Sequence, residues 1–418
     1  MMSLQIFNTL GRKQAPFKPH TDKIVYMYVC GPTVYDYLHV GNFRGAVFFN
    51  LVKNWLTTLG YRVRYTYNYT DVDDKIIQRA LKEGVSAAEI SAKYIGEFKK
   101  DFDALQLSPH DHNPKVTENI DAIIKFIERL IFHNKAYAVG GEVIYSIKAF
   151  KDYGKLSGRN LEDLESGHRV EPSANKQDPL DFVLWKPAKE DEPGWDSPWG
   201  KGRPGWHIEC STLAHETLGE TIDIHGGGSD LIFPHHENEI AQSEGATGKP
   251  FARFWMHNAF VEFGKEKMSK SKGNVLLARD FIEKYTAEVM KYMLLSVHYR
   301  SISVLNKAHI SDSLRGLARI YSGLAWADEL LSQGGTEADA AFSAELTKLK
   351  EQASSAMNDD FNTPQVFARI FDAVRLLNAQ APRNKKADAR ARGKAKAFRA
   401  FVQFWGDQMA LFKAPPAT

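Results

Sequence analysis

The sequence predicts an α/β protein built on a doubly wound parallel sheet, with an inserted subdomain and a following α-helical bundle. Strand-like and helix-like segments alternate over residues 1–136 and again over residues 204–277, as in a parallel sheet covered by helices. Residues 137–203 interrupt this order with short strands among Gly, Pro and Trp. Residues 278–418 show helical spacing of apolar residues. These observations divide the chain into four parts.

The first part, residues 1–136, begins with a short strand and a polar loop and continues into the first half of the sheet. Its strands show alternating β-branched and aromatic residues, and its helices show apolar residues three and four apart. Gly31-Pro32 ends the first sheet strand. In chain order, the predicted elements are strand 24–30, helix 40–59, strand 62–68, an acidic helix start at 70–75, and helices 87–105 and 116–134.

The remaining parts follow the same reasoning. In the insertion, residues 142–147 are predicted as a strand. The second half of the sheet is predicted to contain a helix from Trp206, strand 221–225 with a glycine turn at 226–228, a helix from Pro234, and one strand over 254–263. Gly334-Gly335 separates two helices of the bundle. The bundle helices are predicted at 278–285, 287–297, 311–331, 341–357, 364–378 and 389–412.

Composition excludes several classes of protein. The chain has 418 residues, enough for two or three domains, and a net charge of +3, too small by itself to indicate nucleic-acid binding. No apolar run approaches the roughly 20 residues that span a bilayer, so no membrane association is expected. The N-terminus shows no secretory signal, and only two cysteines occur. A cytoplasmic, reducing location is therefore expected.

The tetrapeptide His39-Val40-Gly41-Asn42 lies between the first sheet strand and the next helix. The unpaired N–H groups at a helix N-terminus attract anions. Gly41 has no side chain, so a nucleotide could lie against the backbone, and the side chains of His39 and Asn42 can donate hydrogen bonds to phosphate. The tetrapeptide is thus a candidate phosphate site, and the alternative is an ordinary helix start with a surface histidine.

A second candidate is the basic loop Lys267-Met268-Ser269-Lys270-Ser271. Two lysines three residues apart, near Gly264 and Gly273, could close on a triphosphate and offset the charge of leaving pyrophosphate. The alternative is a solvated surface loop.

Together, these two motifs resemble those of the class I aminoacyl-tRNA synthetases. Longer segments are similar to cysteinyl-tRNA synthetases in particular, and the resemblance extends from the N-terminus to about Asn378. The segments are Cys-Gly-Pro-Thr-Val-Tyr-Asp at 30–36, Thr-Asp-Val-Asp-Asp-Lys at 70–75, Gly-Trp-His-Ile-Glu-Cys at 205–210, Asp-Ile-His-Gly-Gly-Gly-Ser-Asp at 223–230 and Phe-Pro-His-His-Glu-Asn-Glu at 233–239. One departure is Asn42, where the better-known class motif ends in His; Asn keeps a hydrogen-bond donor.

The resemblance implies a Rossmann-like catalytic domain that uses ATP with Mg²⁺ to activate L-cysteine and passes it to tRNA(Cys). It assigns catalysis to His39, Asn42, Lys267 and Lys270. It assigns ATP binding to these four together with Gly41, Gly226, Gly227 and Asp230, and cysteine binding to Thr70, Trp206 and His225. From sequence alone, Trp206 could equally be a core aromatic and His225 a hydrogen-bonded core histidine.

The only two cysteines, Cys30 and Cys210, both fall where such a site would be lined. His235 and Glu239 are four apart and share a helix face, and two thiols, an imidazole and a carboxylate are acceptable ligands for zinc. A rival local pair is His207 with Cys210, and a free cysteine is often only a small buried hydrophobe. The resemblance favours one Zn²⁺ per chain on Cys30, Cys210, His235 and Glu239, where it would select the thiolate of cysteine.

The C-terminal part departs from the family. The resemblance implies that relatives usually follow the bundle with a small mixed domain that reads the anticodon, and we expect this chain to lack it. A basic stretch near the end is instead a candidate phosphate-binding surface, or a solvated helix face: Arg383, Lys385, Lys386, Arg390, Arg392, Lys394, Lys396 and Arg399. A monomer is expected. Two alternatives remain, namely a ligase that passes cysteine to a small amine, as in mycothiol synthesis, and a non-catalytic synthetase-like binding protein.

Overall fold

The structure is a computed structural model that describes residues 3–160, 175–263, 276–381, 383 and 388–414, together with the backbone of residues 266–267. A central sheet of four parallel strands has the order β10 (Ala252–Asn258), β9 (Ile222–Gly228), β3 (Ile24–Val29) and β4 (Arg62–Tyr67). β3 and β9 belong to the two halves of the chain that flank the insertion and pair in the middle of the sheet. The predicted fold class is confirmed.

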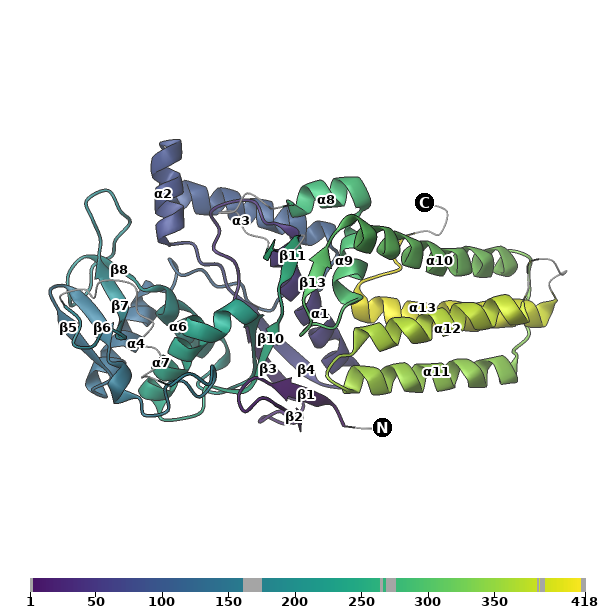
Figure 1. Ribbon diagram of the computed structural model, residues 1–418, viewed down its shortest axis with the longest axis horizontal. Helices are drawn as coiled ribbons and strands as arrows, with labels where there is room; N and C mark the ends of the chain where they lie inside the picture. Colours follow the sequence, from purple (N-terminus) through teal and green to yellow (C-terminus); the bar gives the residue numbers. More distant parts are fainter. Residues whose placement is uncertain are drawn as a thin grey trace.

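Helices cover both faces of this sheet (Figure 1). Their starts follow from local sequence. Asp73 caps the N-terminus of α2 through the N–H of Lys75, and Ser86 and Glu89 form a capping box at the start of α3. Gly84 ends α2 in a left-handed conformation. The helices of this part are α1 (Phe43–Thr58), α2 (Asp74–Glu83), α3 (Ala87–Ala104), α4 (Ile120–Phe132), α6 (Trp206–Leu218) and α7 (Glu237–Thr247).

The insertion forms a separate antiparallel sheet with the order β5 (Ala136–Val139), β6 (Glu142–Tyr145), β7 (Phe182–Pro187) and β8 (Gly202–Pro204). It lies at one end of the molecule (Figure 1). Arg203, on its last strand, is buried and bonds Asp74 at the start of α2 and Glu192. This ion pair fastens the insertion to the first half of the sheet.

The helical bundle extends from the opposite end (Figure 1). It joins α1 through stacked indoles, because the rings of Trp55 and Trp405 lie 5.8 Å apart, and through hydrogen bonds of Thr58 and Asn54 to Gln408. The helices of the bundle are α8 (Ala278–Tyr285), α9 (Ala287–Leu295), α10 (Lys307–Leu331), α11 (Ala340–Asn358), α12 (Thr363–Gln380) and α13 (Ala389–Met409).

No helix of the described residues is long and apolar enough to cross a bilayer.

Three local predictions were wrong. Residues 254–263 form two strands, since Ala259-Phe260 separate β10 from β11 (Val261–Phe263), which joins a different small sheet with β12 (Glu266–Lys267) and β13 (Ser303–Leu305). The glycines at 226–228 continue β9 and do not form a turn. The N-terminal segment forms two paired strands, β1 (Gln5–Asn8) and β2 (Lys13–Pro16), and not one.

The basic stretch near the C-terminus has more acidic partners than the linear sequence suggests. Arg390 pairs with Glu337 at 2.9 Å, Lys394 pairs with Asp339 at 3.3 Å, and Arg399 pairs with Asp328. The guanidinium of Arg392 donates to the carbonyl of Gly335 at 2.6 Å. These side chains hold the connection between α10 and α11 against α13. The tRNA role of this surface stays a prediction. Lys385 and Lys386 lie outside the described residues.

The close contact between the α10–α11 connection and α13 predicts that replacing a helical glycine, Gly393, with alanine lowers stability. A Cβ added at Gly393 in α13 would lie 1.8 Å from the carbonyl oxygen of Glu337. Gly393→Ala should therefore lower the free energy of unfolding by about 1–3 kcal/mol, because the close approach is overpacked. A helical Gly→Ala change in open space stabilises instead by roughly 0.5–1 kcal/mol. Gly96→Ala in α3 is the matched control, since nothing lies within 4 Å of its Cβ position.

Thermal unfolding of the two variants decides the point. We expect the midpoint to fall for Gly393→Ala and to rise or stay constant for Gly96→Ala. A rise for both would contradict the close crossing of α13 by the 335–339 segment.

Candidate functional site

The candidate site forms where the carboxyl ends of β3 and β9 meet the starts of α6 and α7. Cys30 follows β3 directly, and Cys210 lies one turn into α6. Gly31 lets the β3 end approach β4, because a Cβ there would overlap the carbonyl oxygen of Asn68. The Gly31 N–H donates to Asn68 Oδ1 at 2.9 Å. The backbone turn that places Cys30 is thus built around a glycine.

The structure brings together all four side chains that were predicted to hold a metal. One donor atom from each of Cys30, Cys210, His235 and Glu239 lies within 4.8 Å of the others. The two sulfurs are 3.6 Å apart, Cys30 Sγ lies 3.6 Å from Glu239 Oε1, and His235 Nε2 lies 3.0 Å from the same oxygen. Cys210, His235 and Glu239 are buried, and Cys30 is partly buried. The rival partner of Cys210, His207, belongs to neither of the metal-sized groups among the described residues.

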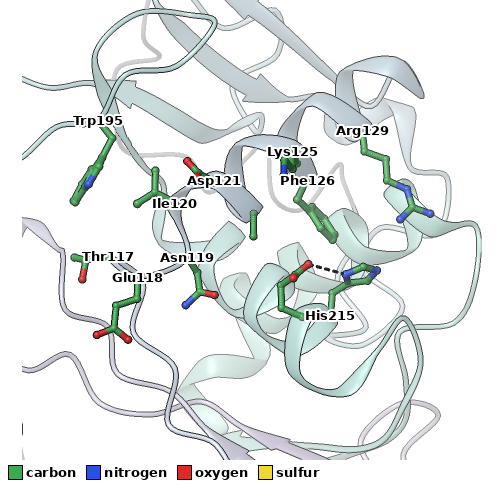
Figure 2. A pocket seen from close by; sticks show the side chains of 12 residues that line it. Thr117, Glu118, Asn119, Ile120, Asp121, Lys125, Phe126, Arg129, Trp195 and His215 are labelled. Atoms are coloured by element: carbon green, nitrogen blue, oxygen red, sulfur yellow. Dashed lines mark hydrogen bonds and ion pairs between the residues drawn. The ribbon is translucent and has the colours of Figure 1, made fainter.

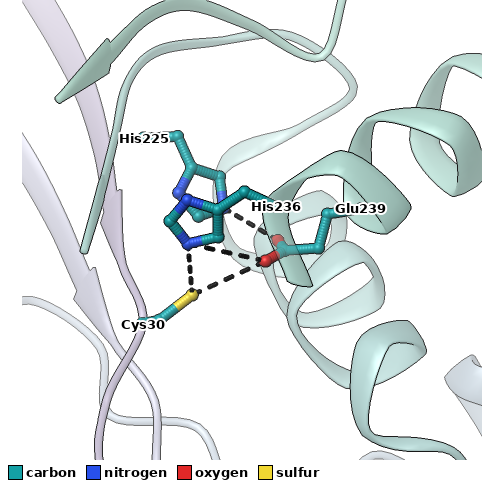
Figure 3. A group of neighbouring side chains, drawn as sticks. All are labelled: Cys30, His225, His236 and Glu239. Atoms are coloured by element: carbon teal, nitrogen blue, oxygen red, sulfur yellow. Dashed lines mark hydrogen bonds and ion pairs between the residues drawn. The ribbon is translucent and has the colours of Figure 1, made fainter. Parts of the chain in front are cut away.

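A second group shares two of these ligands. Figure 3 shows Cys30, His225, His236 and Glu239, which also offer donor atoms within 4.8 Å of one another. His236 Nε2 lies 3.4 Å from Cys30 Sγ, and His225 Nε2 lies 2.8 Å from Glu239 Oε2. Glu239 Oε1 is approached by members of both groups, since His235 Nε2 lies 3.0 Å and His236 Nε2 lies 3.8 Å from it, whereas Oε2 is bonded by His225. The geometry offers two overlapping sets of donors, with Cys30 and Glu239 common to both.

Burial and charge set the protonation of this cluster. The hydrogen bond from Cys30 lowers the pKa of the Cys210 thiol to about 6, whereas burial raises the pKa of Cys30 well above its usual range. Burial alone would raise the pKa of Glu239, but His225 and His235 outweigh it and lower that pKa to about 2. Burial opposes protonation of His235, yet Glu239 and Cys210 raise its pKa to about 10. The lowered pKa values of Cys210 and Glu239 favour a negative charge on both side chains, and deprotonated ligands suit a divalent cation.

Further histidines fix the orientation of these ligands. His207 Nδ1 lies 2.9 Å from His235 Nδ1, which leaves His235 Nε2 toward Glu239. His236 Nδ1 lies 2.8 Å from His257 Nε2, and the far nitrogen of His257 lies 2.8 Å from Thr9 Oγ1. Burial lowers the pKa of both His207 and His257 to about 3, so both rings are neutral at pH 7. Such outer partners hold ligand rings in one tautomer.

The side chains predicted to surround cysteine lie beside the cluster. Trp206 stacks on His235 with ring centroids 4.2 Å apart, yet 41% of its surface is exposed, so one face is open to line a pocket. His225 is fully buried. The hydroxyl of Thr70 donates to Glu209 Oε2 at 3.0 Å. Burial raises the pKa of Glu209 well above its usual range.

Sequence reasoning missed Glu209, His236 and His257 as site residues. Glu209 immediately precedes Cys210, and His236 immediately follows His235, so their proximity to the ligands was a usable signal. His257 carried no such signal. It enters the site because β10 pairs with β9 in parallel, which sets His257 opposite Gly227.

The nucleotide motif forms one turn of 3₁₀ helix, Val40–Asn42, that leads into α1. Asn42 Oδ1 accepts the N–H of His39 at 3.0 Å, which turns the amide NH₂ group outward as a donor. Leu276 and Ala278, which follow the basic loop in the sequence, lie against this turn: the Val40 N–H donates to the Leu276 carbonyl at 3.1 Å and the Ala278 N–H donates to the Leu38 carbonyl at 2.9 Å. Lys270 and the side chain of Lys267 lie outside the described residues.

The glycines of β9 leave space that side chains of the protein itself occupy. A Cβ at Gly226 would lie 2.3 Å from the ring of Phe49, and one at Gly227 would lie 2.8 Å from the ring of His236. Their side-chain positions are therefore filled by the core, so any contact with adenosine would have to use their backbone. Asp230 follows in the short 3₁₀ helix Ser229–Leu231 and is exposed.

A cavity of about 660 Å³ lies apart from this cluster (Figure 2). It is lined by the start of α4, the end of α6 and Trp195 of the insertion. Its charged side chains have both signs, among them Glu118, Lys125 and Arg129, and Arg129 already pairs with Glu220 at 3.1 Å. None of the residues predicted from sequence is among its described lining residues, so it is not the predicted site.

Comparison with known proteins identifies the family of the chain. Residues 16–315 match the family described as tRNA synthetases class I (C) catalytic domain, and residues 354–413 match the DALR domain. A cysteine–tRNA ligase of Bdellovibrio bacteriovorus is 54% identical over 412 residues, covering 99% of this chain and 86% of that protein. One of Geobacter sulfurreducens is 50% identical over 380 residues, covering 90% and 79% of the two chains.

Solved structures share the fold at low identity. Mycobacterium tuberculosis methionyl-tRNA synthetase in complex with methionyl-adenylate aligns with a TM-score of 0.71 at 15% identity, covering 93% of this chain and 92% of that one. A putative arginyl-tRNA synthetase of Campylobacter jejuni aligns with a TM-score of 0.63 at 15% identity, covering 94% of each chain. With its catalytic-domain match and its close relatives, the chain belongs to the cysteine–tRNA ligases, a family of class I aminoacyl-tRNA synthetases.

Proposed function

We propose that this chain activates L-cysteine with ATP and transfers it to tRNA(Cys), selecting the amino acid through its thiol. Membership of the family supports the reaction. The observation that carries the selection is the convergence of Cys30, Cys210, His235 and Glu239 next to the open face of Trp206. A cysteine side chain that reaches these ligands would meet a site built for sulfur.

The donor set fits zinc. Two sulfurs, one imidazole and one carboxylate lie within 4.8 Å of one another, and zinc accepts all three ligand types. Zinc bound there would supply a Lewis acid that takes the thiolate of cysteine far better than the hydroxyl of serine. A site that depends on one bonding partner rejects an analogue without it by orders of magnitude. Of the four residues that would hold the metal, Glu239 is the hardest donor and is already hydrogen-bonded by His225.

The rest of the cysteine would be held by neighbouring side chains. Thr70 donates a hydrogen bond to Glu209 and accepts one from the Asn68 amide at 3.5 Å, so one lone pair of its oxygen remains to accept from the substrate ammonium group. Trp206 would cover one side of the pocket, and buried His225 would close its base. Asp230, exposed at the end of β9, would bind the ammonium group or the ribose.

The reaction itself needs no protein nucleophile. The cysteine carboxylate attacks the α-phosphorus of ATP, an oxygen–phosphorus bond forms, and the bond to pyrophosphate breaks. His39 and the amide of Asn42 would donate to the phosphates at the start of α1, with the backbone at Gly41 close by and Mg²⁺ accompanying ATP. Lys267 and Lys270 would stabilise the charge on pyrophosphate. The hydrogen bond of Val40 to Leu276 supports this, since Leu276 follows the basic loop in the sequence and Val40 belongs to the His39–Asn42 turn, called the phosphate turn below.

Transfer to tRNA is tested by charging tRNA(Cys) with radiolabelled cysteine. We expect charging that depends on ATP and does not occur with radiolabelled serine. If cysteine-dependent pyrophosphate exchange proceeds but tRNA stays uncharged, the acceptor is a small amine and the transfer step proposed here is wrong.

Metal content tests the proposed ligands. We expect about one zinc per chain by elemental analysis of the purified protein, and its loss in His235→Gln, because that ring belongs to the proposed set. His236→Gln is the matched control: its ring belongs only to the second group and should be dispensable for retaining the metal.

Retention of zinc by His235→Gln together with its loss from His236→Gln would assign the metal to the second group. A metal-free wild-type protein that still prefers cysteine to serine would contradict the proposed basis of selection.

Lys270→Ala should slow adenylate formation with little effect on cysteine binding. Its charge is needed mainly as negative charge moves onto pyrophosphate, and such a contact contributes about 3–4 kcal/mol, or roughly 10²–10³ in rate. Cysteine-dependent ATP–pyrophosphate exchange measures the rate, and Lys284→Ala, a surface lysine on α8, is the control. An exchange rate as high as that of the control would refute the assigned role.

A further inference from the structure

Asp360 occupies a strained turn between α11 and α12 and is 1% exposed. Its φ is +54°, and so is that of Phe361, although neither is glycine. Two consecutive left-handed residues are costly and persist only where surrounding contacts hold them. The turn lies between two bundle helices, and the Asp360 side chain bonds to β1 and to residues 299–300, which follow α9.

Those contacts come from two separate segments. Asp360 Oδ1 accepts from the Phe7 N–H at 2.8 Å and from the Tyr299 hydroxyl at 2.7 Å, while Oδ2 accepts from Arg300 Nε at 2.7 Å. The Asp360 carbonyl lies 3.1 Å from His298 Nε2. One buried carboxylate thus fastens the bundle to β1 and to the loop 298–301, which we call the linking loop.

The other side of the linking loop is held by Arg44. This residue is 2% exposed, and its guanidinium donates to the carbonyls of His298, Tyr299 and Ser301 and to that of Phe260. Arg44 is in the first turn of α1, two residues after Asn42. Arg44, which follows the His39–Asn42 turn, and Asp360 of the bundle therefore both bond to the linking loop, and both contact His298 and Tyr299.

Additional contacts stiffen this connection. The ring of Tyr299 stacks on Phe48 of α1 with centroids 4.1 Å apart. The Tyr299 carbonyl accepts the N–H of Ala259, directly after β10, at 2.8 Å. The linking loop is thus in contact with α1 and with the sheet end that carries the site, so a shift of the loop would move both.

We propose that Asp360 is a positioning residue for adenylate formation, acting through the linking loop and Arg44 on the His39–Asn42 turn. The carboxylate touches neither ATP nor cysteine. It sets where the loop lies, and Arg44 transmits that position to the N–H groups and side chains at the start of α1. The position of the bundle then affects how well the turn binds phosphate. The inference rests on the proposed function, since it concerns the ATP step of that reaction.

A purely structural role for Asp360 is the competing explanation, and the fold offers a control for it. Thr58 Oγ1 donates to Gln408 Oε1 at 2.9 Å and also joins the bundle to α1, but at the last residue of that helix, away from the phosphate turn. Thr58→Val removes a bond between the same two parts without touching the linking loop. It should lower stability without changing the kinetics of the folded protein.

The experiment measures cysteine-dependent ATP–pyrophosphate exchange for the full chain, normalised to active sites, together with thermal unfolding. The variants are Asp360→Asn, Arg300→Gln, Arg44→Lys, Thr58→Val and the double variant Asp360→Asn with Arg44→Lys. Arg300 is 39% exposed on its side chain, so Arg300→Gln should fold even if Asp360→Asn does not. Coupling through such networks typically amounts to about 5–150-fold.

We expect KM for ATP to rise at least about fivefold in Asp360→Asn and Arg300→Gln, with KM for cysteine little changed. The double variant should be less impaired than the product of the single effects, because both act on one loop. Normal KM values in folded Asp360→Asn and Arg300→Gln, an equal rise in Thr58→Val, or independent effects in the double variant would overturn the proposal. Absence of exchange in the wild-type protein would instead refute the proposed function.

Discussion

The buried carboxylate of Glu239 is the interaction on which the site depends. Taking a carboxylate out of water is costly unless it is paired, and Glu239 is paired on both oxygens, with His225 at 2.8 Å and His235 at 3.0 Å. These bonds define the positions of both rings and, with Cys30 and Cys210, gather donor atoms at one point of the sheet edge. The four ligands come from both halves of the chain, so the site exists only when β3 and β9 are paired.

Much of this arrangement could be predicted from sequence. The strand that leads to Cys30, the helix that begins at Trp206 and the helix that contains Glu239 all show regular patterns in the sequence. The carboxyl ends of parallel strands also meet at one edge of a sheet. What the patterns alone could not decide was which histidines face the cysteines. His235 and His236 are adjacent and both are buried near Glu239, yet each belongs to a different one of the two donor groups. His257 was missed because its position depends on the register between β9 and β10, which local sequence does not encode.

The failed predictions have physical causes of the same kind. Gly226 and Gly227 were expected to form a turn, yet they continue β9, and the space beside them is filled by Phe49 and His236 from elsewhere in the fold. The basic stretch of α13 shows few acidic residues nearby in the sequence, but the α10–α11 connection brings Glu337 and Asp339 against it. Long-range packing supplied the missing partners in both cases. Local patterns predicted secondary structure well and side-chain partners less well.

The central claim is that the cluster at the sheet edge recognises cysteine through its sulfur. X-ray absorption at the zinc edge measures it directly, because scattering from sulfur and from lighter ligands differs. The two cysteines of the chain should give two sulfur ligands in the free protein, since both belong to the proposed set. The account predicts a third sulfur ligand when L-cysteine is added and no change with L-serine. An unchanged metal environment with saturating cysteine would contradict it.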